Sequence, residues 1–463
     1  MSNQVKMSKS KFQNWLIKII EYLFYLFIFL LPWQTRFIYQ QGVLNGNNWE
    51  YGTFSLYSTE LLLGLIFLGL IILFFAKVKS IKLNYKISWL NILVLVFLAY
   101  SLLSLIWSVN KEITWYKWLL LVDAVAVFFI IRGLKLNFKK IAHSFVLAGL
   151  VQSGLAIYQF LTQSIGANKW LGISAQLVGQ GGVSVVEGAG RWLRAYGSWS
   201  HPNMLGGWLV VCLFFLIALL FQYHRENYQP PWRVSKALIG RAVWLFGSLV
   251  IISYALLLTF SRSAWLGLIV GLLMIWLFLW QRKAKPQLKF FGKVNFILIL
   301  VLVMFVVNYS GLLYSRLNTG SRLEAQSVAE RQVGWQQAIE IIKDSPFLGV
   351  GLGGYTQALY DNDSTRPAWE YQPVHNLDLL ILAELGIIGW LLLTIIVLGV
   401  VYQGLKKMFP TSELSKLLIL ATVMALLIIG LFDHYLWSFY SGLILAAIVL
   451  GLLNIKRGRA SVF

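Results

Sequence analysis

Long apolar segments recur from one end of this chain to the other, and they constrain its fold more than any other feature. An apolar segment of about 17 or more residues is long enough to cross the hydrocarbon core of a bilayer, roughly 30 Å, as a helix. Of the 463 residues, 58% are hydrophobic and only 12% are charged, against about a quarter charged in soluble proteins. The sequence therefore predicts an all-α polytopic membrane protein.

The apolar runs predict about twelve transmembrane helices. The first run follows several lysines, as in a signal peptide, but no small-residue cleavage site follows it, so we expect an uncleaved span. The spans divide the chain into residues 1–161 with spans one to five, 162–313 with an outer loop and spans six to nine, a large outer loop at 314–384, and 385–463 with the last three. The expected spans are 15–31, 57–76, 88–107, 116–132, 141–161, 202–222, 241–260, 263–280, 294–313, 385–402, 414–431 and 437–454.

Basic residues predict how these spans are oriented. With a cytoplasmic N-terminus, about 27 of the 39 Lys and Arg residues fall at cytoplasmic connections or at the ends of spans beside them. The positive-inside rule then places both termini in the cytoplasm and the two long connections, 162–201 and 314–384, outside. The net charge of +21 is a topology signal that also attracts anionic lipid headgroups, and it does not indicate nucleic-acid binding.

The larger outer loop has structure of its own. Residues 329–342, AERQVGWQQAIEII, match an amphipathic helix, which we expect to lie along the membrane surface and to stop before Pro346. Residues 349–354, GVGLGG, satisfy G-x-G-x-x-G, but they follow a Pro-Phe turn rather than a strand. That context argues against dinucleotide binding, and the glycines are expected to let the backbone turn sharply.

Three of the five histidines, His201, His375 and His434, fall on the outer side, and one of them suits a general base. His375 stands at the start of a helix, and Asp378 can share its face and orient the imidazole. The alternative is that His375 and Asn376 only cap that helix. Without a helical His pair, and with a single cysteine, the sequence predicts no bound metal.

Arginines form the second group of outer candidates. Arg262 lies in the short hinge of TFSRSAWLG, where an arginine near bilayer depth either has a partner and a purpose or snorkels to the interface. Asp123, within the fourth span, is a functional candidate or the partner of an arginine or an indole. We expect Arg316, Arg322 and Arg366 to be solvated loop charges. Other outer arginines, named below with the family resemblance, are expected to bind phosphate.

Four stretches, in order, resemble the O-antigen ligase and polymerase superfamily of bacterial envelope proteins. They are RAYGSWSHPNMLGG (194–207), TFSRSAWLG (259–267), ERQVGWQQAIEIIKDSPFLGVGLGGY (330–355) and HNLDLLILAELGIIGWL (375–391). The resemblance implies a GT-C-like membrane fold in the bacterial inner membrane. It also implies that a glycan on undecaprenyl diphosphate is moved at the periplasmic face to an acceptor, the lipid A core in ligases, without metal or cofactor.

The resemblance also implies roles for individual residues. His375 matches the histidine that activates the acceptor hydroxyl, and Asp378 or Asp433 would tune it. Arg194 and Arg262 match arginines that hold the diphosphate, Arg331 matches the arginine at the start of the loop helix, and Arg191 is an alternative to Arg194. Asn203 is expected to cap the next helix, and supporting roles fall to His201, Asn203, Asn376, Asp433 and His434.

Three other functions fit the same sequence. A polymerase of the superfamily would use a second lipid-linked repeat unit as acceptor. A solute or anion transporter would be expected to show inverted repeats and helices broken near the midplane, whereas no convincing repeat is evident and the polar residues gather in one outer loop. A non-catalytic scaffold of an envelope assembly would leave the outer His and Arg residues dispensable.

Overall fold

The computed structural model describes residues 2–75, 88–134, 136–188, 190–227, 236–318, 320–408 and 414–453. It is mostly helical. The α-helices of the described residues are α1 (Ser2–Leu30), α2 (Ser58–Phe75), α3 (Trp89–Leu103), α4 (Lys111–Gly133), α5 (Phe138–Thr162), α6 (Pro202–Glu226), α7 (Lys236–Leu258), α8 (Arg262–Gln281), α9 (Lys285–Leu317), α10 (Arg322–Asp344), α11 (Tyr355–Asn362), α12 (Leu377–Met408), α13 (Leu414–Gly430), α14 (Tyr435–Ser438) and α15 (Tyr440–Leu453).

Ten helices of the described ranges are long and apolar enough to cross a membrane: α1 to α9 and α12. Each coincides with one of the first ten expected spans. The last two expected spans coincide with α13 and α15, which are apolar but shorter. The prediction of a helical, polytopic membrane protein is confirmed, and the count of twelve crossings stays a prediction.

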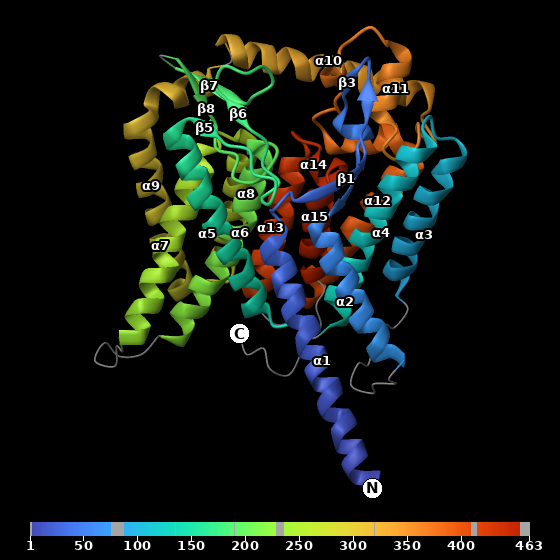
Figure 1. The fold of residues 1–463 in the computed structure, drawn as a ribbon. Helices are drawn as coiled ribbons and strands as arrows, with labels where there is room; N and C mark the ends of the chain where they lie inside the picture. Colours follow the sequence, from blue (N-terminus) through green and yellow to red (C-terminus); the bar gives the residue numbers. More distant parts are fainter. Residues whose placement is uncertain are drawn as a thin grey trace.

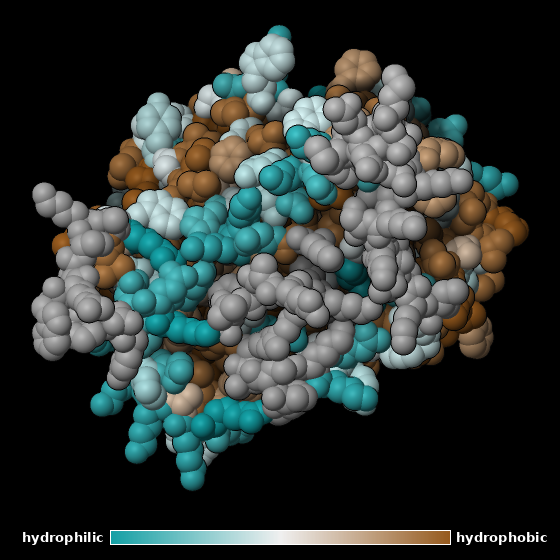
Figure 2. Space-filling view, turned by 90° about the horizontal axis from the view of Figure 1, so that it is seen from below, coloured by the Kyte–Doolittle hydropathy of each residue, from teal (hydrophilic) through white to brown (hydrophobic). Residues whose placement is uncertain are grey.

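The non-spanning elements gather at one end of the bundle. Figure 1 shows the strands, α10 and α11 at the end opposite the one at which α1 begins, with α10 lying across the tops of the spans. Figure 2 views the molecule from the end at which α1 begins. Among the residues that the structure describes, hydrophilic ones cover much of this end and hydrophobic ones lie along its flanks. This distribution suits a bundle whose sides contact lipid and whose ends contact water.

The prediction of an all-α chain is wrong in one detail, because four small antiparallel sheets lie in the connections. They pair β1 (Arg36–Gln40) with β4 (Phe54–Tyr57), β2 (Val43–Leu44) with β3 (Asn47–Asn48), β5 (Ser164–Ile165) with β6 (Gln176–Leu177), and β7 (Val185–Glu187) with β8 (Arg191–Leu193). Strands of two to five residues are too short for an alternating pattern to emerge from the sequence.

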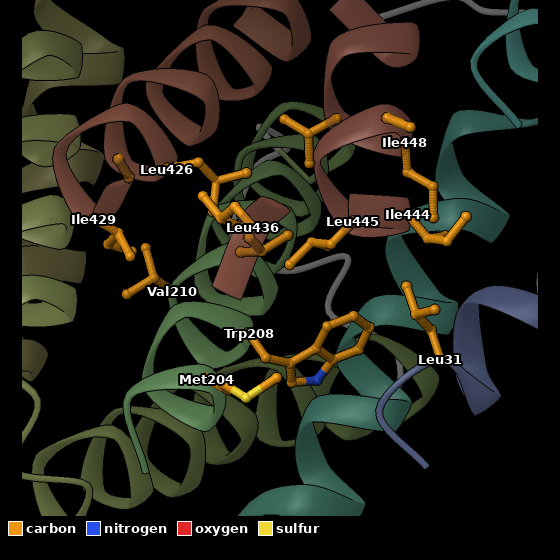
Figure 3. Close-up of a cluster of buried hydrophobic side chains, with 14 of the residues drawn as sticks. Leu31, Met204, Trp208, Val210, Leu426, Ile429, Leu436, Ile444, Leu445 and Ile448 are labelled. Carbon is orange, nitrogen blue, oxygen red and sulfur yellow. The ribbon is translucent and has the colours of Figure 1, made fainter. Parts of the chain in front are cut away.

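Helix α6 lies at the centre of the bundle. It packs against α5, α7, α8 and α13, and its most apolar 18-residue window is entirely buried. Its side chains, such as those of Met204, Trp208 and Val210, belong to a cluster that includes Ile429 of α13 and Ile444 of α15 (Figure 3). Because α6 is surrounded, the polar residues at its N-terminus open onto the middle of the strand-bearing end.

Helix α12 is kinked near its start, and the glycine-rich segment 349–354 packs at this kink. Gly386 has φ 64° inside the helix, and a Cβ there would lie 2.2 Å from the carbonyl oxygen of Phe347. Gly349 has φ 70°, and the amide of Gly351 donates to the Glu384 carbonyl (2.9 Å). The expectation of sharp glycine turns is confirmed, and these turns fix the first two turns of α12, which follow His375.

Candidate active site

His375, Asp433 and His434 come together where α12 begins and α13 ends. The Nδ1 atom of His375 lies 3.9 Å from Oδ1 of Asp433, and the rings of His375 and His434 are 5.0 Å apart. Asp433 and His434 are buried, whereas the His375 side chain is about one third exposed. The His375 imidazole is thus the member of this cluster that a substrate can reach.

Asp433 is held by a chain of buried hydrogen bonds that starts at Arg194. Arg194 donates through Nε to the carbonyl of Thr259 (2.7 Å) and through Nη2 to Oδ1 of Asn203 (2.7 Å). Asn203 in turn donates through Nδ2 to Oδ2 of Asp433 (2.8 Å). The backbone amide of His434 donates to the other oxygen, Oδ1 (2.9 Å). Arg194 is therefore buried and linked through Asn203 to the carboxylate.

The residue that caps α6 is His201, and the expectation that Asn203 does so is wrong. Nδ1 of His201 accepts from the amide of Asn203 (3.1 Å), and Pro202 occupies the first helical position, where its missing N–H costs nothing. The second ring nitrogen, Nε2, pairs with the Ser184 hydroxyl (2.8 Å). Both ring nitrogens of His201 are therefore engaged, and the side chain of Asn203 is free to bridge Arg194 and Asp433.

Burial keeps the clustered imidazoles neutral near pH 7. Burial lowers the pKa of His375 below its ordinary value, although the Asp433 charge partly opposes the shift. The same cause lowers the pKa of His434 to about 3. Burial raises the pKa of Asp433, but the charge that the neighbouring imidazoles carry when protonated at low pH, together with the hydrogen bond from the Asn203 amide, outweighs it, so the net shift is downward. A neutral imidazole beside an ionised carboxylate is the form a general base requires.

Asp378, expected to share a face with His375, points elsewhere. Its Oδ1 accepts from Nε1 of Trp390 (2.8 Å), twelve residues along α12. Asn376 caps α12, because its Oδ1 accepts from the Leu379 amide (2.9 Å), while its Nδ2 donates to the Leu431 carbonyl (3.1 Å). The cap reading thus holds for Asn376, and the carboxylate beside His375 is Asp433.

Arg262 belongs to a partly buried ionic cluster. It is the first residue of α8, after the short hinge, and its Nη2 lies 2.9 Å from Oε2 of Glu324. Arg316 pairs with the other oxygen of Glu324 and donates through Nε to the Phe260 carbonyl (3.0 Å). Arg316 is only 8% exposed, so the expectation of a solvated loop charge is wrong for this residue.

Arg331, on α10, lies between this ionic cluster and the histidines. It is half-buried, and charge interactions link it to Arg262, Asp433 and Glu324. Burial, with the charge of Arg262, lowers its pKa, but a guanidinium stays protonated near pH 7. Arg331 therefore provides a cationic group near His375, and Arg262 provides a second one near Arg331.

Other expected residues lie away from this cluster. Arg191 is exposed on the β7–β8 hairpin, Arg322 pairs with Glu187, and Arg366 pairs with Asp363 (2.7 Å). Asp123, in α4, interacts with the carboxyl of Glu60 at the start of α2, so its partner is neither the arginine nor the indole that the sequence suggested.

The histidine cluster also has the spacing of metal ligands. One ligand atom from each of His375, Asp433 and His434 lies within 4.8 Å of the others, and two imidazoles with a carboxylate are a familiar zinc-binding set. However, Nδ1 of His434 is engaged with the Ser438 hydroxyl (2.6 Å). The guanidinium of Arg331 is electrostatically coupled to the same cluster and opposes a second cation. The prediction of no metal stays a prediction, tested below by chelation.

Sequence reasoning missed two residues of the site, Glu324 and Arg316. Glu324, in the first turn of α10, is 3% exposed, and a buried carboxylate requires a cationic partner. The only sequence signal for either residue was its place in an outer segment next to the helix of 329–342. Nothing along the chain indicates that Glu324 bridges the end of α9 and the start of α8.

About a third of the chain, in its second half, matches a known protein family. Residues 247–394 match the model of a protein family described as O-antigen ligase. The match runs from α7 into α12 and includes Arg262, Arg331 and His375, so it confirms the resemblance read from the motifs. No curated protein matches the chain. An O-antigen ligase or polymerase type of glycosyl transfer is therefore the activity that the family match supports.

Proposed function

We propose that this chain is an inverting glycosyltransferase of the O-antigen ligase type. It moves a glycan from undecaprenyl diphosphate to a hydroxyl of the lipid A core at the periplasmic face of the bacterial inner membrane. One observation carries this proposal: a neutral, partly exposed imidazole, His375, lies beside the carboxylate of Asp433 and close to the guanidinium of Arg331. A base and an anion site next to each other are what such a transfer needs.

In the proposed reaction, His375 takes the proton of the acceptor hydroxyl while the acceptor oxygen attacks the anomeric carbon of the donor sugar. The bond between that carbon and the diphosphate oxygen breaks, and the configuration inverts. The imidazolium that forms is stabilised by Asp433, whose Oδ1 is 3.9 Å from Nδ1. Asn203 and Arg194 hold this carboxylate in place.

Arginines stabilise the leaving group. As the glycosidic bond breaks, negative charge grows on undecaprenyl diphosphate, and Arg262 and Arg331 offer guanidinium groups that match phosphate oxygens. Oε2 of Glu324 lies 2.9 Å from Nη2 of Arg262. Glu324 thus holds the guanidinium in position until a diphosphate with higher charge competes for it.

The remaining parts of the proposal concern topology and partners. Both termini face the cytoplasm, consistent with the basic connections, and the fold is GT-C-like. The partners are the lipid-linked glycan, the glycan acceptor and membrane lipids, with no nucleic acid. The reaction uses no cofactor and no metal.

The test is transfer from a purified undecaprenyl-diphosphate glycan to lipid A core, in detergent with EDTA, by wild type and His375→Ala. We expect transfer by the wild type and its loss in His375→Ala. The matched control is His143→Ala, near the start of α5, which should transfer glycan as the wild type does. Chain growth on the lipid-linked glycan without transfer to the core would identify a polymerase. Absence of glycan transfer of any kind would overturn the proposal in favour of a transporter.

A further inference from the structure

A second pocket, polar and uncharged overall, lies beside the histidine cluster and is not used by the reaction above. Its volume is about 210 Å³, below the roughly 300–1,000 Å³ of pockets for drug-sized ligands. Its walls come from three connections at the strand-bearing end: residues 34–57, residues 165–200, and Phe439 before α15. A pocket of this size suits a single ring-sized group.

The pocket is held open by contacts between its walls. The hydroxyl of Thr35 donates to the Trp170 carbonyl (2.6 Å), and the hydroxyl of Ser198 donates to the Pro32 carbonyl (2.7 Å). Gly172 has φ 64°, and a Cβ there would lie 2.1 Å from the carbonyl carbon of Gln34. These contacts fasten the connection after α1 to the segment before α6, so the space between them is a fixed feature of the fold.

The charges that line this pocket cancel. Arg36 makes two hydrogen bonds to the carboxylate of Glu50, at 2.6 and 2.9 Å. One carboxylate balances one guanidinium here, whereas Arg262 and Arg316 share the single carboxylate of Glu324 and so keep a net positive charge. The pocket is therefore less suited to the diphosphate than the arginine cluster is. An uncharged ligand is favoured here, which separates this pocket chemically from the arginine cluster.

The other lining groups suit a sugar ring. Tyr57, Tyr196, Trp199 and Phe439 offer aromatic surfaces against which the C–H faces of a pyranose can pack. The Gln176 side chain is half-buried in the pocket wall, and an amide both donates and accepts, as adjacent sugar hydroxyls require. Nε1 of Trp199, a lining residue, is buried and has no hydrogen-bond partner among the described residues.

The pocket shares two walls with the candidate active site. The Phe439 ring lies 6.2 Å from the His434 ring, which is 5.0 Å from His375. In the segment before α6, Arg194 faces Asn203 and the active site, whereas Tyr196, two residues later, lines the pocket. A glycan whose reacting hydroxyl sits at His375 can therefore reach this pocket with a neighbouring sugar residue.

We infer that this pocket binds an uncharged, polyhydroxylated sugar residue of the glycan acceptor and so orients the acceptor hydroxyl at His375. The binding site itself is argued from the pocket's chemistry. Only the assignment to the acceptor, rather than to the donor glycan, rests on the proposed function.

The test measures binding directly, without turnover. The full-length protein in detergent is titrated with two lipid-free probes, lipid A core oligosaccharide and O-repeat oligosaccharide, and binding is followed by saturation-transfer NMR and calorimetry. We expect the core oligosaccharide to bind, and Gln176→Ala to weaken it roughly five- to tenfold, the effect of one hydrogen bond. Ser174→Trp, which places a large ring at an exposed lining position, is expected to abolish binding. Gln180→Ala, exposed in the same connection but outside the lining, is the control.

The outcomes separate this inference from the proposed function. Binding of the O-repeat probe alone, with the same sensitivity to Gln176→Ala and Ser174→Trp, would support a sugar pocket and reassign it to the donor glycan. Binding of neither probe, or equal binding by all variants, would overturn the inference. The binding measurement uses no donor lipid, so its result does not depend on whether the separate assay detects glycan transfer.

Discussion

The carboxylate that lies next to His375 is Asp433: Oδ1 of Asp433 is 3.9 Å from Nδ1 of the histidine. The two residues lie on separate elements, His375 before α12 and Asp433 after α13. Their juxtaposition gives the site its base, and it makes the dependence of activity on pH predictable.

We expect Asp433→Asn to lower kcat by about a hundredfold or more, because the imidazolium formed in the reaction loses its counter-charge. Wild-type activity should rise with pH through the pKa of His375, which lies below 6.5, because only the neutral ring accepts a proton. The Asp433 charge raises that pKa, so its removal should move the acidic limb to lower pH. The pH profiles of kcat for both proteins check this, and an unmoved limb would contradict the pairing.

We expect Asp378→Asn to change kcat by less than about threefold. The asparagine keeps an oxygen that can accept from Nε1 of Trp390, and His375 makes its carboxylate contact with Asp433 instead. Transfer kinetics measured beside Asp433→Asn are the test. A loss at Asp378→Asn as large as that at Asp433→Asn would assign the orienting role to Asp378.

We expect Arg262→Lys to raise the KM for the lipid-linked donor about tenfold, because an ammonium lacks the planar fork that binds two phosphate oxygens. Arg322→Lys is the matched control: its side chain is 69% exposed and pairs with Glu187, away from Glu324. Donor titrations at saturating acceptor measure both. Equal KM values for Arg262→Lys and wild type would remove Arg262 from the diphosphate site.

Gly386→Ala should destabilise the protein by roughly 2 kcal/mol or more, since alanine is strained at φ 64° and its Cβ would meet the Phe347 carbonyl. Gly292→Ala, in α9, has open space around the new methyl group and should leave the melting temperature unchanged or slightly higher. Thermal unfolding in detergent compares the two. An unchanged melting temperature for Gly386→Ala would mean that the kink is dispensable.

Chelation tests whether the cluster of His375, Asp433 and His434 holds a metal. We expect transfer activity to be unchanged after dialysis against EDTA, because in the proposed reaction Asp433 stabilises the imidazolium of His375 and no cation is needed. Metal analysis of the purified protein accompanies the assay. Loss of activity with EDTA and its return on addition of Zn²⁺ would instead assign these three residues as ligands.

The sequence by itself determined the spans, the sharp glycine turns and the loop helix, because hydropathy, helical periodicity and the demands of positive φ are local properties of the chain. The loop helix was expected at 329–342 and extends over Arg322–Asp344, ending before Pro346 as predicted. His375 was also accessible from the sequence, through the motif that it begins. Short strands such as those at 36–57 were not, since two to five residues carry too little periodicity.

Only the tertiary structure decided which polar side chains meet. Asp378 is three residues from His375 yet bonds Trp390, whereas Asp433 arrives from another helix. Glu324 and Arg316 likewise come from different helices, and they meet because the ends of α8, α9 and α10 converge. A buried charge must find a partner, but where the partner comes from depends on how helices pack, and that packing is set by contacts between distant segments.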